Sequence, residues 1–302
     1  MKISTSTGIS AKRFGTDIAI QMIAQAGFDA YDMDMCKIHV TDNPLVADDY
    51  MDYIKHLKSV AQENGIVCNQ AHAPFPTQLN GNDEYNKMTS ELIIRSMECA
   101  AFLGAKAIVI HPIKNLSSSQ AKVFGYEEFE SKQKLYDANI EFFNKLIPYC
   151  EKFNIKIAVE NMWERHPLHH ETLLPAILGY AEEHRKFIQD INSEWIVGCL
   201  DIGHALICGE KPQTTIRHLG NKYLKALHVH DCNGYEDSHV LPYSMKTDWN
   251  EILKALSDIK YDGDFTFEAD NALVNFPDEL MSEGLRHMCI VGRYMVNKIQ
   301  KK

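Results

Sequence analysis

The stretch Ile155-Lys-Ile-Ala-Val-Glu-Asn161 shows the pattern on which the whole chain is built. A short, almost continuously apolar run ends in a carboxylate and an amide. Runs of this kind are typical of strands that are covered on both faces, as strands are in a parallel sheet. The pattern recurs, and we predict eight strands, at residues 2–7, 28–35, 66–72, 105–111, 155–161, 195–201, 224–230 and 264–269.

Amphipathic segments separate these runs. Ile54, Leu57 and Ala61, for example, recur at spacings of three and four residues, which predicts one buried helix face. Eight strand–helix units in this length predict a single (β/α)8 TIM barrel over residues 1–302, with its site at the C-terminal ends of the strands. An open doubly wound sheet is the alternative, but its Gly-x-Gly-x-x-Gly is absent after the first strand.

Composition restricts the class of protein. Of the 302 residues, 45% are hydrophobic and 24% charged, which is typical of a folded core and not of a disordered chain. The sequence contains no run of about 18 apolar residues, so no membrane span is predicted. The polar start of the chain is unlike a signal peptide, and the eight scattered cysteines contain no Cys-x-x-Cys pair. We therefore expect a cytoplasmic protein. A net charge of −10 disfavours a nucleic-acid partner.

Polar side chains stand where the predicted strands end. In a barrel these ends converge on one face, and buried charges there are costly unless they are paired or bind a metal. Three carboxylates and one imidazole favour one divalent ion, Mn²⁺, Zn²⁺, Co²⁺ or Mg²⁺. Such a site can remove a carbon-bound proton from a sugar through a metal-stabilised enediolate. The four predicted ligands are Glu160, Asp201, His228 and Glu268.

Four short motifs carry a family resemblance. Val-Glu-Asn-Met at residues 159–162, Leu-Asp-Ile-Gly-His at 200–204, His-Val-His-Asp at 228–231 and Phe-Glu at 267–268 resemble the xylose-isomerase-like TIM-barrel superfamily. The superfamily includes sugar phosphate isomerases, ketose 3-epimerases and endonuclease IV. The resemblance implies the same four metal ligands. It also implies that Glu160 and Glu268 are the acid–base pair, and that His204 is a catalytic residue contacting a substrate oxygen.

The substrate expected from this resemblance is a small carbohydrate or polyol, and the reaction is isomerisation or epimerisation. Trp163 is a candidate to stack on the sugar, with packing under its loop as the alternative. Residues 237–249 resemble the family stretch Asp-x-His…Pro-Gly-x-Gly…Asp-Trp, with Tyr243 and Met245 in place of its glycines. Gly234 stands where the epimerases carry an arginine. Both departures lie on the substrate side. The expected substrate-binding residues are His72, His111, Trp163, Asp237 and His239.

An endonuclease IV-like zinc AP endonuclease is the main alternative. Its nine zinc-ligand positions match His72, His111, Glu160, Asp201, His204, His228, Asp237, His239 and Glu268. The negative charge and the absence of a Lys/Arg-rich loop weigh against DNA, because DNA binding relies on several phosphate contacts. A related lyase or dehydratase and a partner-dependent subunit are further alternatives. A homo-oligomer is expected from the resemblance.

Three other residues have structural interpretations. His230 is expected to be a core histidine that points away from His228. Lys114 is interpreted as a surface lysine, with a phosphate contact as the alternative. Trp249 is expected to open a helix and pack.

Overall fold

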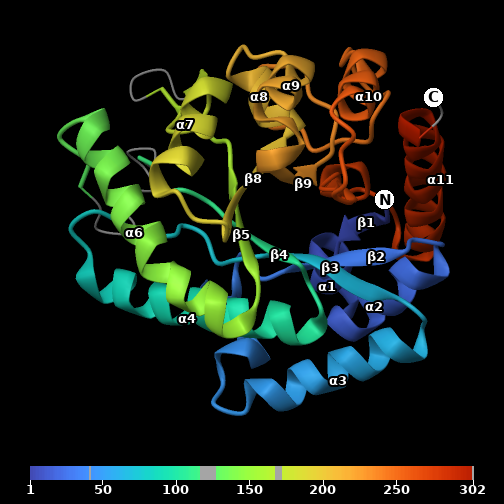
Figure 1. Ribbon diagram of the computed structural model, residues 1–302. Coiled ribbons are helices and arrows are strands. Elements are labelled where there is room, and N and C mark those ends of the chain that lie inside the picture. The colour runs from blue at the N-terminus through green and yellow to red at the C-terminus, as the bar shows by residue number, and fades with distance from the viewer. Residues whose placement is uncertain (41, 116–126, 167–171, 301–302) are drawn as a thin grey trace.

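Eight parallel strands form the centre of the molecule. The computed structural model describes residues 1–40, 42–115, 127–166 and 172–300. The strands lie side by side in the order β10–β1–β2–β3–β4–β5–β8–β9 (Figure 1). They are β1 (Ile3–Ser6), β2 (Ala30–Asp34), β3 (Val67–His72), β4 (Ala107–Ile110), β5 (Lys156–Glu160), β8 (Ile196–Asp201), β9 (Leu224–His228) and β10 (Phe265–Phe267).

The two ends of this sheet meet, and this contact makes the sheet a barrel. The amide of Val229, just after β9, donates to the Thr266 carbonyl of β10 at 2.9 Å. The amide of Glu268 donates back to the Val229 carbonyl at 3.3 Å. All eight predicted strands are present, and the prediction of a (β/α)8 barrel is confirmed.

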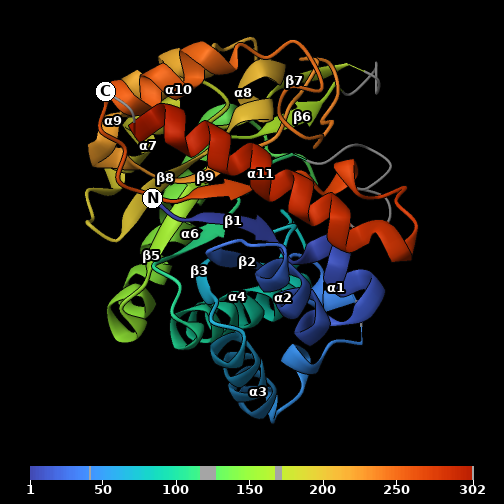
Figure 2. The same cartoon turned by 90° about the vertical axis from the view of Figure 1, so that its right-hand side faces the viewer.

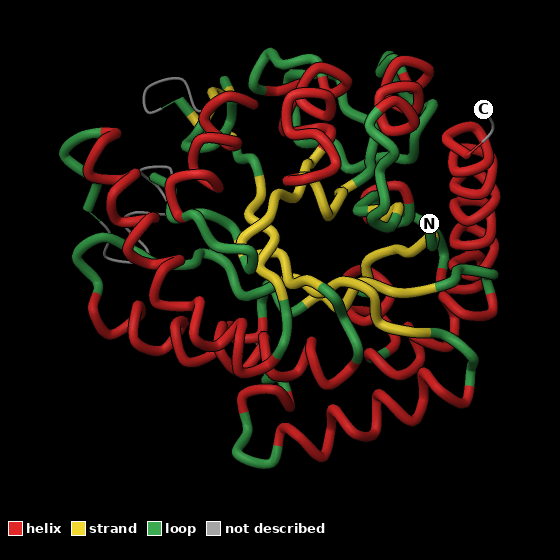
Figure 3. Tube along the Cα trace, viewed as in Figure 1, coloured by secondary structure: helices red, strands yellow, loops and turns green. Residues whose placement is uncertain are grey.

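Helices surround the strands on the outside (Figure 3). The last helix crosses the outer side of β1 and brings the C-terminal segment beside the N-terminal strand (Figure 2). None of the helices in the described part of the chain is both long and apolar enough to cross a lipid bilayer. The helices are α1 (Gly8–Phe14), α2 (Thr16–Gln25), α3 (Tyr50–Glu63), α4 (Asp83–Leu103), α6 (Lys132–Phe153), α7 (Ala181–Ile191), α8 (Ile202–Ile207), α9 (Pro212–Tyr223), α10 (Trp249–Asp258) and α11 (Met281–Gln300).

Two of these helices confirm sequence predictions directly. In α3 the predicted face is buried, with Ile54, Leu57 and Ala61 all inside. Trp249 begins α10 and is buried, as expected. The side chain of Asp248 caps this helix by accepting from the Glu251 amide at 3.2 Å.

The inner face of the barrel explains why the strand ends carry the polar groups. A small apolar cluster fills part of the interior: Ala107, Val109, Ala158, Val197, Cys199 and Ala226. Side chains alternate along a strand, so the next inward position is two residues further on. That position is His111 after β4, Glu160 in β5, Asp201 in β8 and His228 in β9. The interior therefore changes from small and apolar to charged at one end.

The loop after β5 contains structure that the sequence did not predict. None of the eight predicted strands lies between residues 162 and 174. Instead, β6 (Trp163–Arg165) pairs with β7 (Leu173–Pro175) in an antiparallel hairpin. Strands of three residues are too short to show an alternating pattern, which is why they were missed. The hairpin fixes the position of Trp163.

Candidate metal centre

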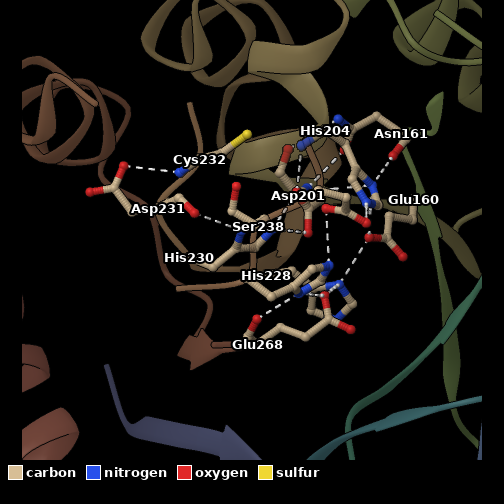
Figure 4. A network of polar contacts seen from close by, with 12 residues as sticks. Glu160, Asn161, Asp201, His204, His228, His230, Asp231, Cys232, Ser238 and Glu268 are labelled. Atoms are coloured by element: carbon tan, nitrogen blue, oxygen red, sulfur yellow. Dashed lines mark hydrogen bonds and ion pairs between the residues drawn. The ribbon is translucent and has the colours of Figure 1, made fainter. Parts of the chain in front are cut away.

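Four side chains from four different strand ends meet at the C-terminal end of the barrel (Figure 4). They are Glu160, Asp201, His228 and Glu268, and one potential ligand atom from each lies within 4.8 Å of all the others. The first three are fully buried. The side chain of Glu268 is 22% exposed and forms part of the cavity wall. The structure thus brings together the four residues that the sequence predicted as metal ligands.

Glu160 is the most enclosed of the carboxylates. Its Oε1 lies 3.0 Å from His228 Nδ1, and its Oε2 lies 2.7 Å from His111 Nε2. Burial alone would raise the pKa of Glu160, but the imidazoles of His228 and His111 outweigh it and hold that pKa well below its usual range. The carboxylate is therefore ionised at neutral pH.

The donor set fits a divalent cation. His228 Nδ1 lies 3.0 Å from Glu160 and 3.2 Å from Glu268, so one imidazole joins two carboxylates. Three carboxylates packed this closely in a buried space are costly without a compensating positive charge. Oxygen-rich sites with one imidazole suit Mn²⁺, Mg²⁺, Co²⁺ or Zn²⁺.

Asp201 is held in place from two sides. His230 Nε2 lies 2.9 Å from each of its oxygens, and the His204 amide donates to Oδ1 at 2.7 Å. Burial raises the pKa of Asp201, and His204 and His230 lower it further than burial raises it, to about 2. His230 reaches this carboxylate because the neighbouring residue is Gly203. A Cβ at position 203 would lie 2.1 Å from the His230 ring.

The expected place of His230 needs correction. It is buried and has a partner, as expected, but the partner is Asp201, so it belongs to the charged cluster. The idea that it points away from His228 was wrong in principle, since residues two apart on a strand share a face.

A second group of ligand-type residues lies beside the first. His204 Nε2 is 3.4 Å from Asp237 Oδ2, and His239 Nε2 is 3.0 Å from Asp237 Oδ1. Burial lowers the pKa of His204, but Asp201 and Asp237 raise it to about 9. Ligand atoms of the three residues lie within 4.8 Å of one another.

Asp231 holds the loop that carries Asp237 and His239. This fully buried carboxylate accepts from the amides of Cys232 at 2.9 Å and Met245 at 3.0 Å. It also accepts from the indole N–H of Trp249 at 3.2 Å and from the hydroxyl of Thr247. The loop is thereby fastened to the end of β9.

A cavity of about 260 Å³ opens over these residues. Drug-sized ligands occupy pockets of roughly 300–1,000 Å³, so this one suits a smaller molecule. Both aromatic and charged side chains line it. Its walls include Phe75, His111, Lys114, Glu160, Trp163, His204, Asp237, His239 and Glu268.

Comparison with known proteins identifies the family. The sequence profile of the xylose isomerase-like TIM barrel matches residues 20–290. The chain belongs to the xylose isomerase-like TIM barrel family. A D-psicose 3-epimerase from Ruminiclostridium cellulolyticum is 23% identical over 261 residues, which cover 82% of this chain and 76% of the epimerase. An uncharacterized protein from Methanocaldococcus jannaschii is 27% identical over 261 residues, covering 84% and 78%.

Solved structures share this xylose isomerase-like barrel. A D-tagatose 3-epimerase-like protein superposes with a TM-score of 0.73 at 22% identity, covering 99% of this chain and 98% of that one. A D-psicose 3-epimerase determined in the presence of D-fructose superposes with a TM-score of 0.72 at 17% identity, covering 98% of this chain and 99% of the epimerase. At these identities the likeness establishes the fold. The predicted family resemblance is confirmed by the family match.

Four of the five residues expected to bind substrate line the cavity of this xylose isomerase-like barrel, whereas His72 is buried and is not part of the cavity wall. His111 lies in the wall, with its ring 4.6 Å from that of His72. The Nε2 of His72 lies 3.7 Å from Glu160. Trp163 also lies in the wall, and its ring is 6.2 Å from that of His204. Asp237 and His239 complete the set.

The sequence reasoning misplaced Lys114 and missed Asp32. Lys114 is 8% exposed and lines the cavity, so its interpretation as a surface lysine was wrong. Asp32 is buried in β2, accepts from Gln70 at 2.8 Å and lies 3.8 Å from His228 Nε2. A carboxylate inside a predicted buried strand was the available signal for Asp32. No local pattern marked Lys114.

Proposed function

We propose that this protein is a divalent-metal-dependent isomerase or epimerase acting on a small carbohydrate. The observation that carries the proposal is the buried cluster of Glu160, Asp201, His228 and Glu268, whose ligand atoms lie within 4.8 Å of one another. Two of its carboxylates line a cavity of monosaccharide scale. A D-psicose 3-epimerase among the relatives supports the same reaction class.

The proposed roles follow from position. Glu160 and Glu268 both reach the cavity, and the imidazole of His228 lies between them. One carboxylate would take a proton from a carbon next to the sugar carbonyl. In an epimerase the other would return a proton to the opposite face, and in an isomerase a proton would be delivered to the neighbouring carbon. A divalent ion held by the four-residue cluster would supply Lewis-acid stabilisation of negative charge on the sugar oxygens.

The remaining cavity residues would bind and orient the sugar. His204, whose pKa is raised to about 9, would donate a hydrogen bond to a substrate oxygen. Burial lowers the pKa of His111 to about 4, more than Glu160 raises it, so this imidazole is neutral at pH 7. Asp237 and His239 would contact hydroxyl groups, and the indole of Trp163 would cover the apolar face of the ring.

Exchange of a carbon-bound proton with solvent tests this proposal. Protein loaded with Mn²⁺ is incubated with a panel of ketoses and aldoses in D₂O, and deuterium in the recovered sugar is measured by NMR. We expect Glu160→Gln and Glu268→Gln each to reduce exchange by about 10²- to 10⁴-fold, the usual contribution of a general acid or base. Both variants are expected to retain metal at least in part.

Glu194→Gln is the matched control. Glu194 is an exposed carboxylate just before β8, at the opposite end of the barrel from the cavity. Its variant is expected to exchange protons at the wild-type rate. No exchange with any sugar, or undiminished exchange in both cavity variants, would refute the proposal.

A nuclease of the endonuclease IV type is the second candidate, and one observation favours it. His204, Asp237 and His239 form a further group of potential metal ligands, as do His72, Glu160 and His228. Metal analysis by inductively coupled plasma mass spectrometry separates the two candidates. About one exchangeable ion per chain supports the sugar reaction, whereas three tightly held zinc ions with nicking of abasic DNA would favour the nuclease.

A further inference from the structure

The loop after β4 places a lysine in the cavity wall that the proposed reaction does not use. Lys114 is only 8% exposed. Its Nζ donates to the backbone carbonyl of Trp163 at 2.7 Å. The same nitrogen lies 4.6 Å from the centre of the Trp163 ring and 5.5 Å from that of Phe75. The ammonium group is therefore held between two aromatic rings at the edge of the site.

In the part of the chain that the structure describes, no carboxylate lies at ion-pair distance from this ammonium group, although Asp237, Glu164 and Glu160 attract it from farther away. Burial lowers its pKa to about 8, against the attraction of Asp237 and Glu164, so most of the group is charged at pH 7. Buried charges in proteins are normally paired, because an isolated one loses its hydration without compensation.

The position of Lys114 makes a bound molecule the natural partner. It lines the same cavity as His111, Glu160 and Glu268, so any occupant meets both the charged cluster and this lysine. An ammonium group has three N–H donors, and the Trp163 carbonyl takes one of them. Arg165 and Glu164 also line the cavity, and the Arg165 guanidinium lies over the Trp163 ring at 5.5 Å.

We infer that Lys114 binds an anionic group of the substrate, a carboxylate or a phosphate. The substrate class of this barrel is then a sugar acid or a sugar phosphate, and not a neutral sugar. This inference rests on the proposed sugar reaction and makes Lys114 a specificity-determining residue. A lysine that served only to fasten Trp163 would show no preference for charge in the ligand.

Binding to a matched set of ketoses tests the inference. D-Fructose, D-fructuronate and D-fructose 6-phosphate are titrated calorimetrically into the Mn²⁺-loaded full-length protein, and inorganic phosphate and acetate serve as fragments. Lys114→Met keeps the apolar stem, and Lys114→Arg keeps the charge. Lys106→Met is the control, because Lys106 is an exposed lysine at the opposite end of the same strand. Thermal melting checks that each variant is folded.

One anionic ketose is expected to bind about 10- to 100-fold more tightly than D-fructose, as hydrogen bonds to charged groups usually provide. The anionic ketose with the higher affinity, D-fructuronate or D-fructose 6-phosphate, shows whether the bound group is a carboxylate or a phosphate. Lys114→Met should bring the ratio of the two affinities, anionic ketose over D-fructose, close to one. Lys114→Arg and Lys106→Met should still bind the anionic ketose more tightly than D-fructose. Equal binding of all three ketoses to wild type, or a preference that survives Lys114→Met, would overturn the inference.

The two proposals fail in different ways. Proton exchange with neutral sugars that is unaffected by Lys114→Met would leave the isomerase proposal intact and refute the role of Lys114. Binding of phosphate or acetate that Lys114→Met abolishes, together with no exchange on any sugar, would refute the isomerase proposal and retain the anion site.

Discussion

Replacing Gly203 with alanine should displace His230 from Asp201. Gly203 lies in α8, where alanine is otherwise preferred over glycine by roughly 0.5–1 kcal/mol. A Cβ at this position would lie 2.1 Å from His230 Cε1 and 2.8 Å from Nε2. Carbon atoms in contact normally lie about 3.5–4.0 Å apart, so the ring must move by more than 1 Å.

The movement has a cost that the structure allows us to estimate. His230 is fully buried and stacks on His239 with ring centres 4.1 Å apart, so it cannot move without disturbing that contact. Overpacking of a core costs about 1–3 kcal/mol, and the lost hydrogen bonds to the Asp201 carboxylate cost about 1.5–3 kcal/mol more. We expect a loss of about 3–5 kcal/mol, or a fall in Tm of about 5–8 °C for a chain of this length.

Thermal unfolding of a double-mutant cycle tests the estimate. The variants are Gly203→Ala, His230→Ala and the two together, and Mn²⁺ affinity is measured alongside. With the ring removed, alanine at position 203 should be neutral or slightly stabilising, so the effect of the first change reverses sign. If Gly203→Ala destabilises equally in both backgrounds, the steric reasoning is wrong. Metal affinity should fall about 10- to 100-fold in Gly203→Ala, as when a residue that supports a metal ligand is lost.

Two further predictions concern buried polar groups outside the four-residue candidate metal cluster. Burial lowers the pKa of His184 to about 4, so between pH 6.5 and 4 the unfolded chain binds a proton that the folded chain does not. As the pH falls from 6.5 to 4, this residue should therefore lower the free energy of unfolding by about 1.4 kcal/mol per pH unit. The pH dependence of urea unfolding should be shallower in His184→Gln. Asp231→Asn should destabilise the protein by about 2–4 kcal/mol, since an amide cannot accept from all four donors. Hydrogen exchange of residues 232–247 should then accelerate more than that of α3.

The residues of the site that lie on strands could be predicted from the sequence. Glu160, Asp201 and His228 continue the inward-facing series of their strands, and that series can be read from alternation alone. Once eight parallel strands are assigned, closure into a barrel brings their C-terminal ends together. The convergence of these side chains follows from the fold without any knowledge of their contacts.

The residues of the site that lie on loops could not be predicted from side-chain alternation. Lys114 lies three residues beyond the inward series of β4, and its burial depends on the Trp163 carbonyl supplied by another loop. Trp163 is in turn placed by pairing with Pro175, a partner twelve residues further along the chain. Contacts of this kind have no period, so a sequence pattern does not indicate them.

Strand ends and loops contribute different parts of the cavity, and this difference bears on substrate specificity. The four-residue candidate metal cluster stands on strand ends that the barrel holds rigidly, whereas Lys114, Trp163 and Asp237 stand on connections fastened by single side chains or short hairpins. Loops can change without disturbing a barrel, so relatives that share the strand-end cluster can differ in the rest of the cavity wall. The glycine at position 234 and the bulky residues at 243 and 245 lie in the loop that Asp231 fastens, but none of the three lines the cavity, and the Tyr243 ring lies 6.2 Å from those of Trp249 and Tyr294. Changes in loops can therefore alter the substrate within this family, and a lysine in the cavity wall with no carboxylate at ion-pair distance among the described residues is the kind of difference that would select a charged sugar.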